Sequence, residues 1–197
     1  MENFRFYFLW LSLICIVMFL LQQISGFTEL FILNKSVFQG QIWRLITAIF
    51  LHGNLVHLIY NLFALLLFGL ILEKTIGSKN FLILFFTSGI IANIISVNFY
   101  TNSLGASGAI MGIIGALTLM KPLMMVWAFG IILPMFIAAI IWVIGDILGV
   151  LGLSQGVGNI AHLSGILIGL IFGIILRIKN IGKTEVFPRD QPKSISK

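Results

Sequence analysis

The residues best suited to chemistry are one serine and three histidines, all of which lie in or beside long apolar segments. They are His52, His57, Ser107 and His162. A serine hydroxyl is a poor nucleophile unless an adjacent base removes its proton, and a neutral imidazole suits that task near pH 7. Gly105, Ala106 and Gly108 are small neighbours that leave the Ser107 oxygen approachable. The pattern predicts that Ser107 and His162 act as a pair, with Ser107 as the nucleophile and His162 as the base.

His57 and one further polar residue, Asn61, could stabilise the charge that acyl transfer creates. His57 and Asn61 are four residues apart, so they share one face of a helix. An oxyanion donor is typically worth about 2.7 to 4 kcal/mol in the transition state. We expect His57 and Asn61, with the backbone N–H of Ser107, to donate to the oxyanion. The alternative, ordinary hydrogen bonds between helices, stays open.

No carboxylate is expected to complete a catalytic triad. The acidic residues are Glu2, Glu29, Glu73, Asp146, Glu185 and Asp190. Only Asp146 lies near the outer end of a predicted helix. We therefore predict a dyad whose imidazole is oriented by packing or a hydrogen bond rather than by an Asp. Such a dyad should be a modest catalyst, since a wrong tautomer can cost about 10⁴ in kcat where an Asp normally fixes it.

The composition places these residues in a membrane protein. Of 197 residues, 59% are hydrophobic and 9% are charged, and the mean hydropathy is +1.12. An average soluble domain is about 25% charged, so a water-soluble globule is excluded. The single cysteine, Cys15, cannot form an intrachain disulfide.

Six apolar segments meet or approach the roughly 20 residues that a membrane-spanning helix needs. They are Phe6–Leu21, Leu55–Leu72, Phe81–Phe99, Ser107–Met120, Leu123–Ile144 and Ile160–Leu176. The expected fold class is an all-α membrane protein with a bundle of six transmembrane helices. We expect residues 1–180 to form one domain and residues 181–197 to form a basic cytoplasmic tail.

The basic residues predict the orientation, because Lys and Arg near helix ends are retained in the cytoplasm. One side of the expected bundle carries Arg5, Lys74, Lys79, Lys121 and the six basic residues between Arg177 and Lys197, and the other carries only Lys35 and Arg44. We therefore expect a multi-pass protein of the cell membrane with both termini cytoplasmic and the site open to the outer face. The net charge of +6 is read as this orientation signal, with no nucleic acid as partner.

Two outer connections differ from ordinary tight loops. Gln22–Leu51 mixes aromatic and charged residues, so it is either a set of short helical turns embedded in the outer interface or an ordinary extracellular loop. Gly145–Gly158 contains five glycines and should be mobile, so that it could act as a flap over the site.

Depth and small-residue spacing indicate which helices meet. Ser107 lies 14 residues before Lys121, His162 lies 15 before Arg177, and Asn61 lies 13 before Lys74. These spacings correspond to about 20 to 22 Å of helix, so the three polar residues reach nearly one depth. Small residues allow close helix packing in lipid, and they recur in two of the segments, as Gly105, Gly108, Gly112 and Gly115 and as Ala161, Gly165, Gly169 and Gly173. We expect these two helices to pack closely and to bring Ser107 beside His162.

Taken together, these motifs resemble those of the rhomboid intramembrane serine proteases of the minimal six-helix type, between about Gln41 and Gly173. The matching motifs are Trp43-Arg44, His52-x4-His57-x3-Asn61, Glu73-x3-Gly77, Gly105-Ala106-Ser107-Gly108, and Ala161-His162 followed by Gly165 and Gly169. The resemblance implies that Ser107 is the nucleophile, that His162 is the general base and acid, and that His57 and Asn61 are oxyanion donors.

The resemblance also implies supporting roles. His52 and the Trp43-Arg44 pair would shape the first loop, and helix five with the Gly145–Gly158 loop would move to admit a substrate helix. Gly105 and Gly165 belong to the matching motifs. Met111 stands where an aromatic residue that packs against the catalytic histidine is frequent in the family, and its soft sulfur can fill that space.

The expected substrates are single-span membrane proteins, cut near helix-weakening residues within the lipid bilayer, without a cofactor or a metal ion. Two other functions were weighed. One is a catalytically silent family member that only binds transmembrane helices. The other is a small transporter that uses its histidines as metal or proton ligands, although zinc would need three or four ligands. The sequence does not indicate the natural substrate or the oligomeric state.

Overall fold

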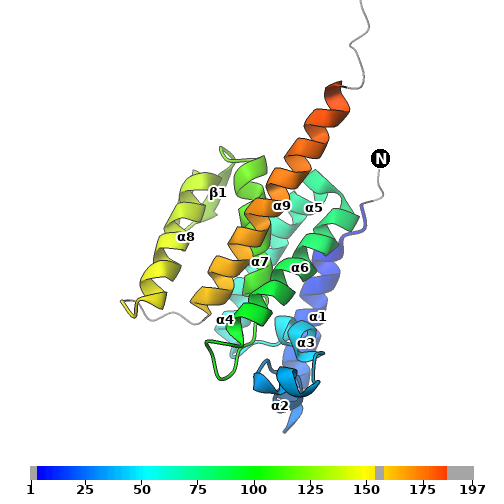
Figure 1. Cartoon of the computed structure of the whole chain (residues 1–197), viewed down its shortest axis with the longest axis vertical. Coiled ribbons are helices and arrows are strands. Elements are labelled where there is room, and N and C mark those ends of the chain that lie inside the picture. The colour runs from blue at the N-terminus through cyan, green and yellow to red at the C-terminus, as the bar shows by residue number, and fades with distance from the viewer. Residues whose placement is uncertain (1–3, 154–157, 186–197) are drawn as a thin grey trace, which may run out of the picture.

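The computed structural model describes residues 4–153 and 158–185, and these form a mostly helical molecule (Figure 1). The longer helical segments are α1 (Tyr7–Leu21), α4 (Leu55–Ala64), which continues through the five-residue η3 (Leu65–Gly69) into α5 (Leu70–Ile76), α6 (Ser78–Ser96), α7 (Ser107–Met120), α8 (Met135–Val150) and α9 (Asn159–Glu185). The shorter ones are α2 (Phe27–Phe31), η1 (Lys35–Gln39), α3 (Arg44–Thr47), η2 (Ala48–Phe50), β1 (Met125–Ala128) and β2 (Ile131–Pro134).

Within the described residues, three helical segments are long and apolar enough to cross a membrane: Leu55–Ile76, Ser78–Ser96 and Asn159–Ile178. Helices α1, α7 and α8 are apolar but shorter. The 14 residues of α7, for example, rise about 21 Å, less than a hydrocarbon core of roughly 30 Å. The expectation of a helical membrane protein is therefore confirmed, and the crossing of all six helices stays a prediction.

The expected helix Leu123–Ile144 is wrong in its first half, which forms a β-hairpin. Strands β1 and β2 pair antiparallel, with Ala128 opposite Ile131. Phe129 and Gly130 form the two-residue turn, and both have positive φ, as a tight hairpin turn requires. Pro134 has no N–H to give to a preceding turn of helix, and α8 begins directly after it. The all-α expectation therefore fails at this hairpin.

The expected loop Gly145–Gly158 is also shorter than predicted, because α8 continues to Val150. A spanning segment in lipid must satisfy its own backbone hydrogen bonds, and this favours helix even through glycines. Gly149 packs directly against the side chain of Asn159 at the start of α9. Residues 154–157 of the predicted flap lie outside the described residues.

Helices α7 and α9 pack backbone against backbone, which confirms the close pair predicted from their small residues. A Cβ atom at Gly165 would meet the carbonyl oxygen of Gly108, and one at Gly169 would meet that of Gly112. On its other side, α7 packs against α6, where a Cβ at Gly108 would lie 2.7 Å from that of Ala92. Helix α7 is consequently the buried centre of the bundle, with Gly108 to Leu117 all buried.

The segment Gln22–Leu51, predicted to face outward and called the first outer connection below, contains the four short helical segments α2, η1, α3 and η2, which Arg44 ties together. The Arg44 side chain is buried and donates to the carbonyl oxygens of Glu29 (2.8 Å) and Ile32 (2.6 Å) and to the Gln41 amide oxygen (2.7 Å). The half-exposed Trp43 indole donates to the carbonyl oxygen of Leu30 at 3.3 Å. The interfacial position of this connection stays a prediction.

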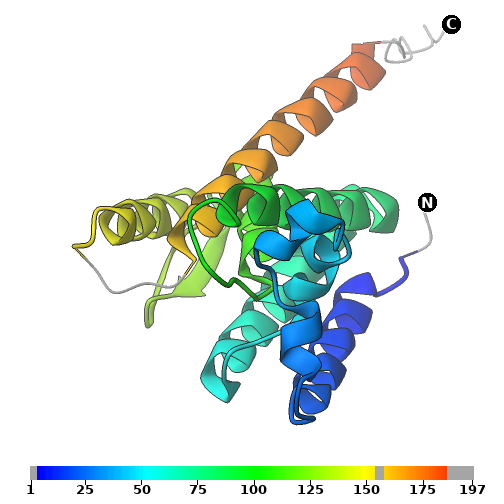
Figure 2. The same cartoon turned by 60° about the horizontal axis from the view of Figure 1, so that its bottom comes forward.

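Glu73 fixes the start of α1 to the end of α5. Its fully buried carboxylate accepts the backbone N–H groups of Tyr7 (3.1 Å) and Phe8 (3.0 Å) and the hydroxyl of Ser78 (2.6 Å). The carboxylate thus satisfies first-turn donors that a helix leaves unpaired, and its charge favours the positive end of the helix dipole. This end of the bundle also holds the C-terminal part of α9, whereas α2 and α3 lie at the opposite end (Figure 1). Figure 2 shows α9 projecting beyond the other helices.

We expect Glu73→Ala to lower the free energy of unfolding by about 1 to 3 kcal/mol, because it leaves buried donors without a partner. Lys74→Gln is the matched control, since Lys74 is on the same turn and exposed. Reversible unfolding in mixed micelles measures both. Equal stabilities would show that Glu73 does not anchor α1.

Candidate active site

A cavity of about 860 Å³ opens between α4, α7 and α9. The residues predicted to do chemistry contribute to its wall. The lining includes His57, Asn61, Gly105, Ser107, Met111 and His162. Gly165, Arg44 and Trp43 lie elsewhere: Gly165 is in the α7–α9 contact and the other two are in the first outer connection. The fold thus brings residues from three distant parts of the chain to one cavity.

Ser107 is the first residue of α7 and is half-buried. Because first-turn N–H groups have no partner within their helix, the backbone around Ser107 can present donors to an anion. Among the described residues, no hydrogen bond links Ser107 to His162. Catalytic hydrogen bonds are often long in the absence of substrate and tighten in the complex.

His57 lies beside Ser107, with Gly105 between them. A Cβ atom at Gly105 would be 3.0 Å from His57 Nε2 and 3.8 Å from Ser107 Oγ. Gly105 also has φ +125°, which an L side chain rarely adopts. The Gly53 N–H donates to His57 Nδ1 at 3.5 Å, an arrangement that favours a proton on Nε2. The His57 imidazole can therefore offer an Nε2–H donor near Ser107.

Asn61 lies one turn further along α4 and is buried. Its side-chain amide donates to the carbonyl oxygen of His57 at 2.9 Å. Since a primary amide has two N–H groups, one remains for a ligand in the cavity. The position of the Asn61 amide is thus compatible with two roles, that of an oxyanion donor and that of a hydrogen bond within α4.

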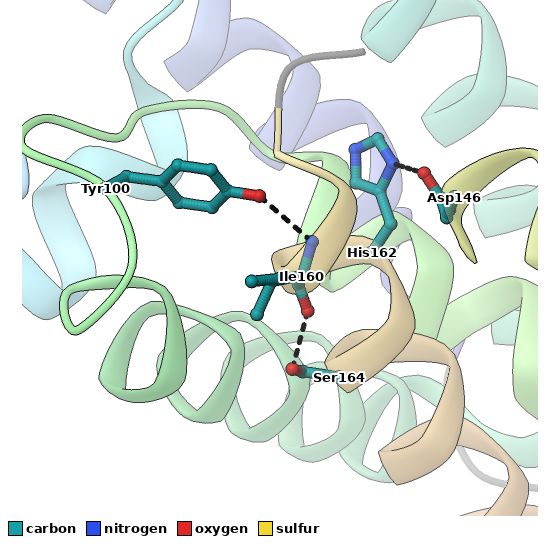
Figure 3. Close-up of polar contacts among 5 residues, drawn as sticks. All are labelled: Tyr100, Asp146, Ile160, His162 and Ser164. Atoms are coloured by element: carbon teal, nitrogen blue, oxygen red, sulfur yellow. Dashed lines mark hydrogen bonds and ion pairs between the residues drawn. The ribbon is translucent and has the colours of Figure 1, made fainter. Parts of the chain in front are cut away.

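His162 has a carboxylate partner, which corrects the expectation that no Asp orients the imidazole. Nδ1 of His162 lies 2.9 Å from Oδ1 of Asp146, near the C-terminal end of α8 (Figure 3). Asp146 is 7% exposed. The sequence interpretation missed this contact because it ended the helix before Asp146. The sequence did offer a signal for this contact. Asp146 is a carboxylate in a strongly apolar segment, and it lies at the end of that segment nearest in sequence to the helix that carries His162.

The start of α9 is held by a second residue that sequence reasoning missed. The hydroxyl of Tyr100 accepts the backbone N–H of Ile160 at 3.2 Å, and Ser164 donates to the Ile160 carbonyl oxygen at 2.6 Å (Figure 3). His162 is in this same first turn, and its own N–H donates to the Gly158 carbonyl oxygen at 3.0 Å. These bonds fix the backbone that carries the imidazole.

His52 is buried behind His57 instead of lining the cavity. The two rings meet edge to face at 5.1 Å, and Nδ1 of His52 lies 3.3 Å from the Phe50 carbonyl oxygen. The backbone of His52 exchanges two hydrogen bonds with the Gln22 side chain, which ties the end of α1 to the start of α4. Burial, and secondarily the nearby His57, lower the pKa of His52 to about 4. A neutral His52 therefore supports the His57 ring.

No group of three or more His, Cys, Asp or Glu side chains in the described parts of the chain could hold a metal ion. His52 and His57 are neighbours, but the contact of His162 is with Asp146. The polar side chains that line the cavity, which include His57, Asn61 and His162, offer acid–base and hydrogen-bond chemistry.

The lowered pKa of His52 gives a pH dependence of stability. Above pH 6.5 this histidine is neutral in both folded and unfolded states, whereas between pH 6.5 and 4 the unfolded state binds the extra proton. Acidification from pH 7.5 to 5 should therefore cost about 2 kcal/mol of unfolding free energy through this group. Unfolding of wild type and His52→Gln at both pH values measures the difference. Identical pH dependences would contradict the prediction.

Comparison with known proteins agrees with this architecture. Residues 39–179 match the family model described as Rhomboid domain. The chain is 35% identical over 156 residues to the Arabidopsis thaliana protein "RHOMBOID-like protein 6, mitochondrial", covering 78% of this chain and 50% of that protein. It is 38% identical over 120 residues to "Rhomboid protease GluP" of Bacillus subtilis (strain 168), covering 57% of this chain and 24% of that protein. The chain spans half or less of the length of these curated relatives. The chain belongs to the rhomboid family, a membrane protein family that includes named proteases.

Proposed function

We propose that the chain is an intramembrane serine endopeptidase that cleaves single-span membrane proteins within or near their transmembrane helices. The observation that carries this proposal is the gathering of Ser107, His57, Asn61 and His162 around one cavity. Relatives whose names include rhomboid protease support the same class of activity.

In the proposed reaction, Nε2 of His162 takes the Ser107 proton as the oxygen attacks the scissile carbonyl carbon. His57, Asn61 and the backbone N–H of Ser107 then donate to the oxyanion of the tetrahedral intermediate. The protonated imidazole gives its proton to the leaving amine, and water repeats the sequence to hydrolyse the acyl-enzyme. The peptide bond must leave its helix first, because an intact helix keeps its backbone groups bonded internally.

We also propose that the protein lies in the cell membrane and that six of its helices cross it. Both termini are then cytoplasmic, and the site opens to the outer face. The excess of basic residues at the α5 and α9 ends supports this orientation.

Helix α8 lies on the side of the bundle opposite α1 (Figures 1 and 2). Aromatic pairs hold α8 and its hairpin against the segment Leu55–Ile76, with ring centroids of Phe68 and Trp142 at 6.0 Å and of Phe63 and Trp127 at 5.9 Å.

A catalytically silent protein that binds transmembrane helices is the second candidate, because several relatives are named only as rhomboid-like. The two functions differ in whether Ser107 reacts covalently.

The nucleophile assignment predicts covalent labelling of Ser107. Wild-type protein in vesicles should react with a fluorophosphonate probe and cleave single-span substrates, and Ser107→Ala should abolish both, because it removes the hydroxyl proposed as nucleophile. Gel fluorescence and mass mapping of cut sites measure the two activities. Labelling that survives in Ser107→Ala would remove the assignment, and a wild type without labelling or cleavage would favour the helix-binding function.

Gly105 predicts a second test. In Gly105→Ala the new methyl group would meet the His57 ring and require an unfavourable φ, so cleavage should fall at least about tenfold if His57 stabilises the oxyanion. Gly40→Ala is the matched control, since Gly40 also has a positive φ (+94°) but its Cβ would meet nothing within 4 Å. Initial cleavage rates compare the variants. Equal rates would show that the His57 position does not matter for turnover.

A further inference from the structure

We propose that Asp146 is the positioning residue for His162, so that in this chain a carboxylate holds the imidazole that serves Ser107 as base. This inference rests on the proposed function and deepens it, because it names what holds the base in its working tautomer. It is drawn from the contact between α8 and α9.

The contact determines which ring nitrogen carries the proton. With the Asp146 carboxylate as hydrogen-bond acceptor, the 2.9 Å contact places a proton on His162 Nδ1. In a neutral imidazole the lone pair is then on Nε2, the nitrogen that must receive the serine proton. Figure 3 shows the second ring nitrogen directed away from Asp146. Asp146 therefore selects the tautomer that can act as a base.

The location of Asp146 indicates a specific role. A carboxylate in an apolar membrane helix is costly, and such groups usually face the interior and pair with a partner. Asp146 is 7% exposed, and the hydrogen bond of its side chain among the described residues goes to His162. Helices α7 and α4, which also line the cavity, contain no carboxylate that could compete for His162. Helix α7 has no titratable side chain, and the titratable side chain that α4 places beside Ser107 is His57. Asp146 is thus the acidic group in position to orient His162.

The proton transfers balance with Asp146 in this role. As Ser107 Oγ bonds to the carbonyl carbon, its proton moves to His162 Nε2, and the ring becomes an imidazolium that still donates from Nδ1 to Asp146. When the C–N bond breaks, the Nε2 proton moves to the leaving amine and the ring is neutral again. Asp146 takes up no proton in these transfers and stabilises the positive ring.

The experiment compares Asp146→Asn and Asp146→Glu with wild type in vesicles, using one single-span substrate that wild type cleaves and Ser107→Ala does not. Asp146→Asn should lower kcat at least about tenfold with KM nearly unchanged, since its amide can hold the ring in the wrong tautomer. Asp146→Glu, which keeps the charge, should recover part of kcat. Glu29→Gln, an exposed carboxylate-to-amide change in the first outer connection, is the matched control and should match wild type.

A spectroscopic measurement tests the tautomer without relying on turnover. In protein labelled with ¹⁵N-histidine, the His162 signals should report an Nδ1–H tautomer in wild type and a shift towards Nε2–H in Asp146→Asn. A wild type with the Nε2–H tautomer, or an Asp146→Asn variant with wild-type kcat, would overturn this inference alone. A loss of kcat in Asp146→Asn that comes without a tautomer change, or that is not partly restored in Asp146→Glu, would also overturn this inference. Absence of Ser107-dependent cleavage in wild type would instead overturn the proposed function.

Discussion

The backbone contact between α7 and α9 is the constraint on which the rest of the molecule depends. In lipid there is no hydrophobic force to bring two apolar helices together, so their association needs close van der Waals contact. Gly108, Gly112, Gly165 and Gly169 allow the two backbones to touch. Any side chain at Gly165 or Gly169 would separate the helices. Because Ser107 begins α7 and His162 is in the first turn of α9, this contact also brings both to the same cavity.

Around this pair, three buried charged or acidic side chains have hydrogen-bond partners on other elements. Arg44 holds the carbonyl oxygens of the first outer connection, Glu73 holds the first N–H groups of α1, and Asp146 meets His162. An unpaired polar group in a dry interior loses the hydrogen bonds that water would give it. Each pairing therefore fixes the relative position of two elements. The Asp146 pairing has a further consequence, since it makes the orientation of the imidazole depend on how α8 packs against α9.

Part of this arrangement could be predicted from residue types and spacing. The four-residue spacing of small residues predicted the α7–α9 contact, and the common depth of Asn61, Ser107 and His162 predicted that they could share a cavity. The boundaries of α8 could not be predicted in the same way. An apolar segment such as Leu123–Ile144 gives no periodicity that separates a hairpin from a helix, and the turn at Phe129 and Gly130 has a positive φ at Phe129, which residue type does not predict because non-glycine residues adopt it only uncommonly.

The sequence by itself determined that the chain is a helical membrane protein and which residue types could do chemistry, because burial in lipid restricts polar residues to places where they have a use or a partner. The tertiary structure alone decided which nitrogen of His162 faces a carboxylate, where the His57 ring lies, and that His52 supports it from behind. These features depend on the side-by-side placement of helices that are far apart in the chain, and spacing along one helix carries no information about the rotation of its neighbour.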